Sequence, residues 1–341
     1  MGPFYIGLLL LAQGSLALDA YVASKTNTAF TIWNYKCDES SDNVEIQYAL
    51  NLVSSKGGGT VWLSDGLFIL SKNVVINSNN ITIRGTNREK TILRLKNGAS
   101  KFVNAGLIRS INTRDIAIRD MTLDGNRANQ STSTDTNYGR YGIFTEVCNN
   151  TLFDNLKVIN WYGYGIDPHG EGGVYKPGYN CKVTNCWVEN NGYDGITIDK
   201  TDGTLVAGNT IVNNGRHGIN VVTGSKNTNV ISNILINNGW NYLGAKGVGC
   251  GVMYQNNQGF DTRYGLVSSN FLRNSSRAAL CLTDVENIKI STNTIDNTPL
   301  CMRVKLINNA NNITIDGDNS CKGIPIKSDT LPYTGPMPMF L

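Results

Sequence analysis

The sequence predicts an all-β protein with a single domain, a right-handed parallel β-helix that carries a capping helix at its amino-terminal end. Two observations lead to this fold. Short runs of Val, Ile, Leu and Thr alternate with turns rich in Asn and Gly over most of the 341 residues. The turns also recur at a nearly constant interval. Such a repeat is typical of a solenoid, in which each coil packs only against its neighbours.

The interval between the turns gives the size of one coil. Three similar turns follow one another at spacings of 23 and then 24 residues, and they are Asn190-Asn191-Gly192, Asn213-Asn214-Gly215 and Asn237-Asn238-Gly239. A coil of about 22 residues with three short strands is one turn of a parallel β-helix, and the chain has room for about ten coils. An immunoglobulin-like sandwich also contains many short strands, but it does not normally keep one register over this length.

The elements can be assigned in order along the chain. Residues 1–17 are expected to be a signal peptide, because a short apolar run ends there at small residues. Residues 18–59 form an N-terminal segment in which 42–55 have apolar residues at helical spacing, and this helix should cap the open end of the coil. The β-helix is expected over residues 60–322. Residues 323–341 contain four of the eight prolines and no expected strand, so they are interpreted as a C-terminal tail.

Two further features agree with export from the cell. The chain has eight cysteines without the spacing of a zinc site, so structural disulfides are expected among about 105 possible pairings. Five N-glycosylation sequons begin at Asn80, Asn129, Asn149, Asn274 and Asn312. We therefore expect a secreted monomer of the extracellular matrix or cell wall, without membrane association once the signal peptide is removed.

The charge of the chain indicates the class of its partner. The formal net charge is +4 and the isoelectric point is near 8.5. This mild excess would attract an acidic polymer, but it lacks the clustered basic patch of a nucleic-acid-binding protein. We therefore expect an anionic polysaccharide partner and no nucleic acid.

A repeated step of Gly followed by an aliphatic residue aligns one strand of each coil. The steps are Gly142-Ile143, Gly165-Ile166, Gly195-Ile196, Gly218-Ile219, Gly251-Val252 and, with Ala for Gly, Ala279-Leu280. The aliphatic residue should point into the coil, and strand alternation then turns the next residue outward. With about 4.8 Å between coils, the polar residues stacked on this face would line a groove about 15 Å long. These residues are Arg140, Glu146, Tyr164, Asp167, His169, Asp194, Asp199, Arg216, His217 and Asn220.

The types of residue on this face favour proton transfer beside a carboxylate. Both histidines of the chain lie there with Tyr, Asp and Arg, whereas a Ser or Cys nucleophile is missing from the set. Arg can neutralise a uronate carboxylate, His can accept a proton and Tyr can donate one. A hydrolase using Asp167, Asp194 and Asp199 is an alternative, and so is a face of ordinary surface residues.

Four segments resemble the mannuronan C5-epimerases of alginate biosynthesis. Residues 164–169, Tyr-Gly-Ile-Asp-Pro-His, are similar to the Tyr-Gly-Phe-Asp-Pro-His motif of that family. Residues 123–130, 191–195 and 216–223 resemble further family segments in the same order, so the resemblance covers about a hundred central residues. Together with the expected signal peptide and the sequons, it suggests the brown-algal type.

The resemblance implies a pectate-lyase-like β-helix that converts β-D-mannuronate into α-L-guluronate within the polymer. Tyr164 and His169 would be the acid/base pair, with His169 favoured as the base, and Asp167 would be their supporting carboxylate. Arg216 would hold the substrate carboxylate. The remaining aligned residues would bind substrate, namely Arg140, Glu146, Asp194, Asp199, His217 and Asn220.

The chain departs from the family pattern at one position. Some members have a catalytic-site Lys where this chain has Gln130-Ser-Thr-Ser-Thr-Asp135, so Arg140 would have to supply the positive charge unless Arg216 suffices. No cofactor or metal is expected to be required; some relatives use calcium, but no Asp-rich nonapeptide repeat indicates it here. A polysaccharide lyase that shares the first step and a non-catalytic polysaccharide-binding β-helix are the alternative functions.

Overall fold

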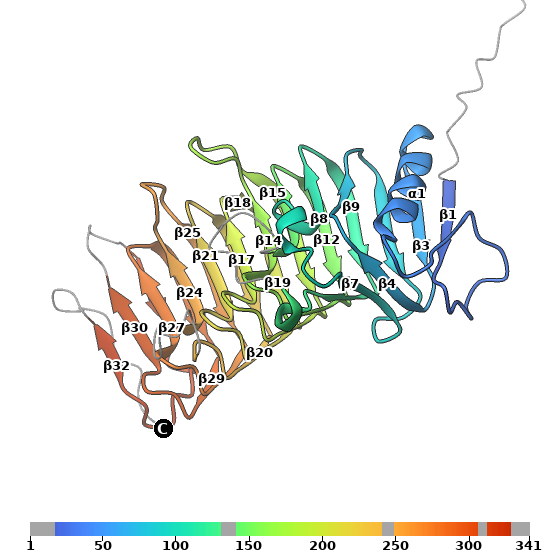
Figure 1. The fold of residues 1–341 in the computed structure, drawn as a ribbon. Coiled ribbons are helices and arrows are strands. Elements are labelled where there is room, and N and C mark those ends of the chain that lie inside the picture. The colour runs from blue at the N-terminus through green and yellow to red at the C-terminus, as the bar shows by residue number, and fades with distance from the viewer. Residues whose placement is uncertain (1–17, 131–140, 241–248, 306–311, 329–341) are drawn as a thin grey trace, which may run out of the picture.

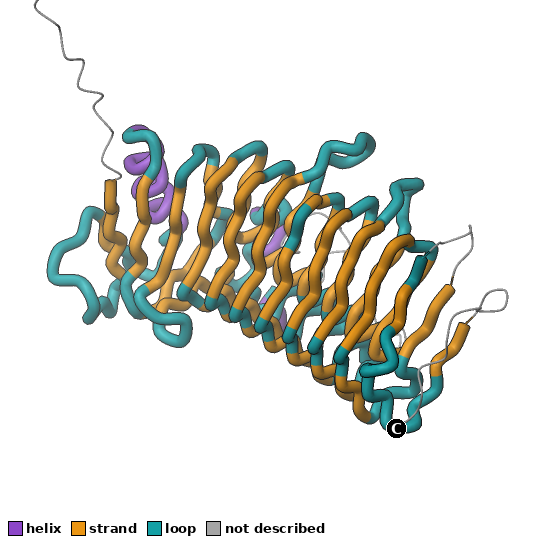
Figure 2. Tube along the Cα trace, turned by 180° about the vertical axis from the view of Figure 1, so that it is seen from behind, coloured by secondary structure: helices purple, strands orange, loops and turns teal. Residues whose placement is uncertain are grey.

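The protein is a solenoid of stacked coils with one helix at its amino-terminal end (Figure 1). The computed structural model describes residues 18–130, 141–240, 249–305 and 312–328. Each coil contributes strands to three parallel sheets, and the strands of successive coils run side by side along the whole body (Figure 2). This architecture confirms the predicted parallel β-helix. The expected signal peptide lies outside the described residues.

The first sheet has 13 strands and includes the earliest part of the described chain. Its strands are β1 (Leu18–Ala23), β2 (Tyr35–Lys36), β3 (Gly59–Leu63), β6 (Ile81–Gly85), β9 (Arg114–Arg119), β12 (Asn149–Asp154), β15 (Gly178–Thr184), β18 (Thr201–Asp202), β19 (Leu205–Ala207), β22 (Lys226–Ile231), β25 (Arg263–Ser268), β28 (Glu286–Ser291) and β31 (Thr314–Ile315). Alternate residues of β3 and β6 are buried, which is the pattern of strands with one face in the core.

The second sheet has nine short strands that close one side of each coil. They are β4 (Gly66–Leu70), β7 (Thr91–Leu95), β10 (Thr122–Asp124), β13 (Lys157–Ile159), β16 (Trp187–Glu189), β20 (Thr210–Val212), β23 (Ile234–Ile236), β26 (Phe271–Arg273) and β29 (Thr294–Asp296). Two 3-10 turns, Ser100–Phe102 and Arg127–Asn129, lie between strands of the early coils.

The third sheet has ten strands and contains the aligned Gly-aliphatic steps. They are β5 (Val74–Ile76), β8 (Gly106–Ile111), β11 (Tyr141–Glu146), β14 (Tyr164–His169), β17 (Ile196–Asp199), β21 (Ile219–Val222), β24 (Cys250–Gln255), β27 (Ala278–Thr283), β30 (Met302–Lys305) and β32 (Ile326–Ser328). The aliphatic residues of these steps form one buried column inside the coil, because each pairs with its equivalent in the next strand.

The expected capping helix is present as α1 (Asn43–Ser55). Its apolar face, which includes Ile46, Leu50 and Val53, is buried against the first coil and therefore covers the apolar interior at that end. The β-helix extends beyond both ends of the range 60–322 that the sequence predicted. Strand β1 pairs with β3 before residue 60, and β32 pairs with β30 after residue 322. The segment after Gly323 therefore begins with a strand of the third sheet, whereas the sequence had predicted a tail without one.

Buried asparagines connect the coils at their turns. In one ladder the Nδ2 of each side chain donates to the Oδ1 of the next, at 2.9–3.0 Å, through Asn209, Asn233, Asn270, Asn293 and Asn319. A second ladder joins Asn191, Asn214 and Asn238 at 3.0 Å. Each amide also satisfies backbone groups that would otherwise be buried without a partner.

Four of the eight cysteines form the expected structural disulfides. One bond joins Cys250 of β24 to Cys281 of β27, and the other joins Cys301 to Cys321. The remaining cysteines are buried thiols, namely Cys37, Cys148, Cys181 and Cys186. Within the described residues, no helix is both long and apolar enough to span a bilayer.

Removing one amide from the longer ladder should destabilise the fold. Asn233 bonds Asn209, Asn270 and the carbonyl of Val206, so Asn233→Ala leaves buried groups unpaired and should cost about 2–4 kcal/mol. The midpoint of urea unfolding measures the loss. Asn77→Ala, at an exposed asparagine, should leave the midpoint nearly unchanged. Equal effects of the two substitutions would contradict a structural role for the ladder.

Candidate active site

The third sheet stacks the predicted site residues as the sequence indicated. Glu146 pairs with His169 and His169 with Asp199, while Thr197 pairs with Asn220 one row away. The register follows from the Gly-aliphatic steps, because Ile166 pairs with Ile196 and all later residues keep the same offset. The side chains are more enclosed than a simple surface groove, since Asp167 is only 2% exposed and Asn220 also 2%.

His169 lies between two carboxylates. Its Nδ1 is 3.5 Å from Oδ1 of Asp167 and 3.5 Å from Oδ2 of Asp199. Burial alone would lower the pKa of His169, but Asp167, Asp199 and Glu146 outweigh it and raise the pKa to about 9. The imidazole is therefore charged at neutral pH.

The pKa values of the two carboxyl groups beside His169 are raised above the ordinary value. Burial, opposed by His169 and reinforced by Asp167, raises the pKa of Asp199 to about 6. Burial also raises the pKa of Asp167. The three groups compete for the same protons, and we place one on His169 because two carboxylates face it. Within the described residues, Nδ1 of His169 and one oxygen of each carboxylate are buried without a hydrogen bond, and Nδ1 faces that oxygen of Asp167 at 3.5 Å.

The phenol ring of Tyr164 is held by its aromatic neighbours. It stacks on Tyr141 at 4.9 Å between ring centroids and meets the edge of Tyr193 at 5.1 Å. The guanidinium of Arg216 lies 5.6 Å from the ring centroid. These contacts fix Tyr164 beside Arg216, and His169 stands at the other end of the same strand β14.

Arg216 is anchored from behind by a buried aspartate. Its Nε and Nη2 donate to the two oxygens of Asp194 at 2.7 and 2.6 Å, in the bidentate geometry that fixes a guanidinium in plane and direction. Burial opposes ionisation of Asp194, but Arg216 dominates and lowers the pKa of this carboxyl to about 2. Arg216 itself remains 23% exposed, whereas Asp194 is completely buried.

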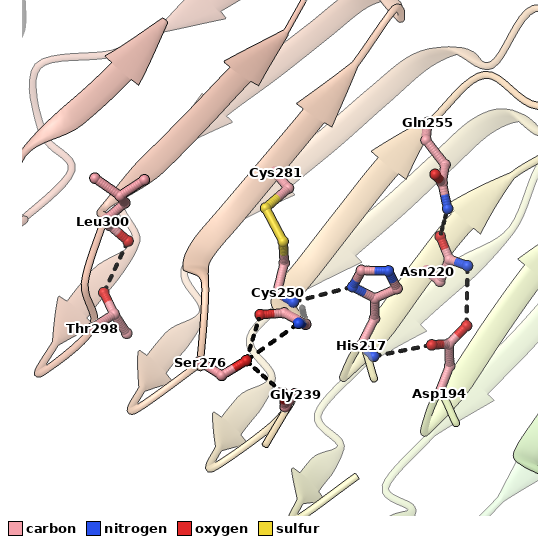
Figure 3. The surroundings of a disulfide bond; sticks show 11 residues. Asp194, His217, Asn220, Gly239, Cys250, Gln255, Ser276, Cys281, Thr298 and Leu300 are labelled. Carbon is pink, nitrogen blue, oxygen red and sulfur yellow. Dashed lines mark hydrogen bonds between the residues drawn. A yellow bond between two sulfur atoms is a disulfide. The ribbon is translucent and has the colours of Figure 1, made fainter. Parts of the chain in front are cut away.

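Asp194 therefore does not line the groove as the sequence predicted. Its oxygens also accept hydrogen bonds from the backbone N–H of His217 and from the side chain of Asn220 (Figure 3). The hydroxyl of Thr197 donates a further hydrogen bond to Oδ2. The amide of Gln255 donates to Oδ1 of Asn220 at 2.9 Å and so orients that side chain. Asp194 and Asn220 are positioning residues for Arg216, because both lie beneath the surface of the site.

His217 is neutral and largely enclosed. Its Nδ1 accepts a hydrogen bond from the backbone N–H of Cys250 at 3.1 Å, so the ring proton is on Nε2 (Figure 3). Burial lowers its pKa to about 4, with Asp194 opposing the shift. A neutral His217 supplies no charge for a substrate carboxylate, so it could hold the carboxylate only as a hydrogen-bond donor.

Three residues near the site were not among those predicted. Tyr193 packs on Tyr164, Phe144 lies 5.4 Å from the ring of His169, and Gln255 orients Asn220. The alignment of the Gly-aliphatic steps in the sequence could have identified two of them, because Phe144 directly follows Ile143 and Gln255 lies three residues after Val252. Of the predicted residues, Arg140 falls outside the described part of the chain.

A calcium ion does not fit the one three-ligand cluster in the described residues. The cluster consists of Cys37, Asp42 and Glu45, near the start of α1. Calcium prefers oxygen ligands, whereas this cluster offers a thiol whose pKa is raised by burial. Both oxygens of Asp42 already accept backbone N–H groups. We therefore assign no role to a metal here.

Two histidines in contrasting sites give a direct test of this electrostatic arrangement. In a proton NMR titration of the imidazoles, one ring should titrate near pH 9 and the other near pH 4. Asp167→Asn should lower the upper value, because it removes one of the carboxylates that stabilise the imidazolium. His169→Ala should remove the upper titration entirely. Two histidines that both titrate near the ordinary value of about 6.5 would contradict the arrangement.

Comparison with known proteins agrees with the fold and the resemblance. Residues 106–262 match the family model described as a right handed beta helix region. The mannuronan C5-epimerase AlgE3 of Azotobacter vinelandii is 28% identical over 210 residues, which are 59% of this chain and 11% of that protein. Alginate lyase 7 of the same organism is 30% identical over 201 residues, 56% of this chain and 23% of the relative.

A solved structure extends the likeness to nearly the whole chain. The A-module of the Azotobacter vinelandii mannuronan C-5 epimerase AlgE4 superimposes with a TM-score of 0.67 at 19% identity, covering 90% of this chain and 88% of the module. This second likeness concerns the fold. The chain spans only a small part of the full length of its curated relatives. It is a right-handed parallel β-helix protein and a homologue of the mannuronan C5-epimerases.

Proposed function

We propose that this chain is a mannuronan C5-epimerase, which converts β-D-mannuronate into α-L-guluronate within alginate. The observation that carries the proposal is the arrangement of Arg216 on buried Asp194, beside Tyr164 and on the same sheet face as His169. Inversion at C5 of a uronate requires a cation for the carboxylate and two proton-transfer groups in the same site. The relatives named as epimerases support the same reaction.

Arg216 would neutralise the carboxylate next to the reacting carbon. Removing the C5 proton places a second negative charge on that carboxylate group, and this charge is the main barrier to the reaction. Because Asp194 already fixes the guanidinium in plane, no reorganisation of the arginine is needed as the charge develops. Thr197 and Asn220 hold Asp194 in turn.

Tyr164 and His169 would form the acid/base pair. With a pKa near 9, His169 carries its proton at neutral pH and is a donor in the unliganded site. We therefore assign reprotonation of C5 to His169 and abstraction to Tyr164 as its phenolate, the reverse of the preference drawn from the sequence. Asp167 and Asp199 would stabilise the imidazolium. After each turnover, Tyr164 would release to solvent the proton taken from C5, and His169 would take up a proton from solvent.

A lyase is the alternative, and the homologous alginate lyase 7 favours it. Both reactions begin with proton abstraction from C5. A lyase then expels the sugar linked at the neighbouring C4 oxygen and leaves an unsaturated end that absorbs ultraviolet light. An epimerase returns a proton to C5 and leaves the chain length unchanged.

We also infer that the protein works outside the cell. Five sequons and two disulfides in the described chain agree with an oxidising secretory route. Mass spectrometry of the protein from its natural source would test this: N-glycans at the sequons support the inference, and an unmodified protein with reduced Cys250 and Cys281 contradicts it.

Two substitutions test the reaction and the site together. Polymannuronate incubated with the protein should develop guluronate signals in proton NMR without a rise in ultraviolet absorbance. His169→Ala and Tyr164→Phe should each slow this conversion by about 10²–10⁴-fold, as expected for the loss of a general acid or base. Tyr179→Phe, at an exposed tyrosine of β15, serves as the control and should convert normally. Unsaturated ends instead of guluronate would mean a lyase, and full activity of His169→Ala would favour a binding protein.

The pH dependence separates the two assignments of His169. If His169 is the acid, its charged form is needed, so the contribution of this group to kcat/KM is full below about pH 9 and is lost as the pH rises through that value. If His169 is the base, kcat/KM rises with pH and levels off only above about 9. In either case, Asp167→Asn should move the change in kcat/KM that reports His169 to lower pH. Tyr179→Phe should leave this part of the pH profile in place.

A further inference from the structure

A cavity of about 390 Å³ lies at the turns that follow β20, β23 and β26 of the second sheet. Its lining residues are Asn213, Asn214, Asn237, Trp240 and Asn274. They offer side-chain amides and an indole ring, and none of them is charged. A uronate would find no cation here, whereas a neutral sugar could use the amides for its hydroxyl groups and the ring for its C–H face.

Trp240 forms the aromatic wall of this cavity. The residue is 42% exposed, although its indole is held in place by the neighbouring coil. Its Nε1 donates a hydrogen bond to the backbone carbonyl oxygen of Asn274 at 2.6 Å. The indole is therefore a fixed, exposed surface that lies directly beside Asn274.

Asn274 begins one of the five sequons, Asn274-Ser275-Ser276. Its Nδ2, the atom that would carry a glycan, donates to Oδ1 of Asn237 at 2.7 Å. This side chain therefore points from its own turn toward Asn237, which also lines the cavity. A glycosylated amide keeps one N–H, so the hydrogen bond to Asn237 can persist after a sugar is attached.

The burial of the sequon sets the order of events. Ser275 is fully buried, and the hydroxyl of Ser276 donates to the carbonyl of Gly239, so the folded sequon is closed to a transferase. Attachment must precede the folding of this coil. In that step Nδ2 attacks C1 of an oligosaccharide linked to a lipid diphosphate: the N–C1 bond forms, the C1–O bond to the diphosphate breaks, and Nδ2 loses one proton.

We propose that Asn274 carries an N-glycan whose first sugar, an N-acetylglucosamine, packs on Trp240 in this cavity. The glycan then becomes part of the packing of the solenoid, because its first sugar contacts turns from three successive coils. The sequons at Asn80 and Asn312 begin at exposed residues outside the cavity lining and serve as internal comparisons. The inference rests on the proposed extracellular location and is independent of the proposed reaction.

The rate at which the glycan is removed from the folded protein tests the packing. The full chain and its variants are secreted from a eukaryotic host with residues 1–17 in place. An amidase that cleaves the bond between asparagine and glycan is then added under native conditions, and glycopeptide mass spectrometry follows each sequon. Trp240→Ala should speed release at Asn274 about fivefold, because the packed sugar must leave the cavity before cleavage. Release at Asn80 and Asn312 should not change, and in urea the parent should lose its protection.

A second tryptophan supplies the matched control. Trp33, between β1 and β2, is 40% exposed, and Trp33→Ala should leave release at Asn274 as in the parent. Asn274→Gln should remove this glycan and keep full activity on polymannuronate. Equal release from the parent and Trp240→Ala, or an unmodified Asn274 beside other glycosylated sequons, would overturn the inference and leave the proposed function standing. A chain without a glycan at any sequon would overturn the extracellular location as well.

Discussion

The in-register stacking of coils is the constraint on which the rest of the structure depends. Each coil pairs its strands with the same positions of the next coil, so a residue's place within one turn fixes its place along the whole solenoid. The buried ladder through Asn191, Asn214 and Asn238 reinforces this register at the turns. A shift by one residue would break the amide ladder and expose the aliphatic column, so both features select the same register.

The candidate active site is built directly on that ladder. Asp194 comes three residues after Asn191, and Arg216 comes two residues after Asn214. The hydrogen bond between the two asparagine side chains therefore places the aspartate and the arginine next to each other on neighbouring coils. The backbone N–H of Arg216 also bonds the carbonyl of Tyr193. The geometry of the bidentate ion pair is therefore set by the stacking of the coils. This stacking keeps the buried charge pair in one arrangement.

The sequence predicted the fold and the stacking because both follow from local patterns. Gly165 is required where it stands, since a Cβ there would come within 2.5 Å of the carbonyl oxygen of Gly195, and that requirement leaves a readable repeat. The burial of Asp194 and the high pKa of His169 leave no such trace, because they arise from packing across several coils. For the same reason the sequence predicted an ordinary histidine base, and it left the disulfide pairing open.

The charges of the catalytic residues are paired within the site itself. The charge of Arg216 is already matched by Asp194, and that of His169 by the carboxylates around it, so the catalytic residues alone offer little net attraction to a polyanion. Such matching is useful for chemistry, because it fixes direction and proton affinity, but it contributes little to holding a chain of uronates. In the proposed reaction the paired charges would therefore stabilise charge at the reacting carbon, and retention of the polymer would fall to contacts outside this set of residues.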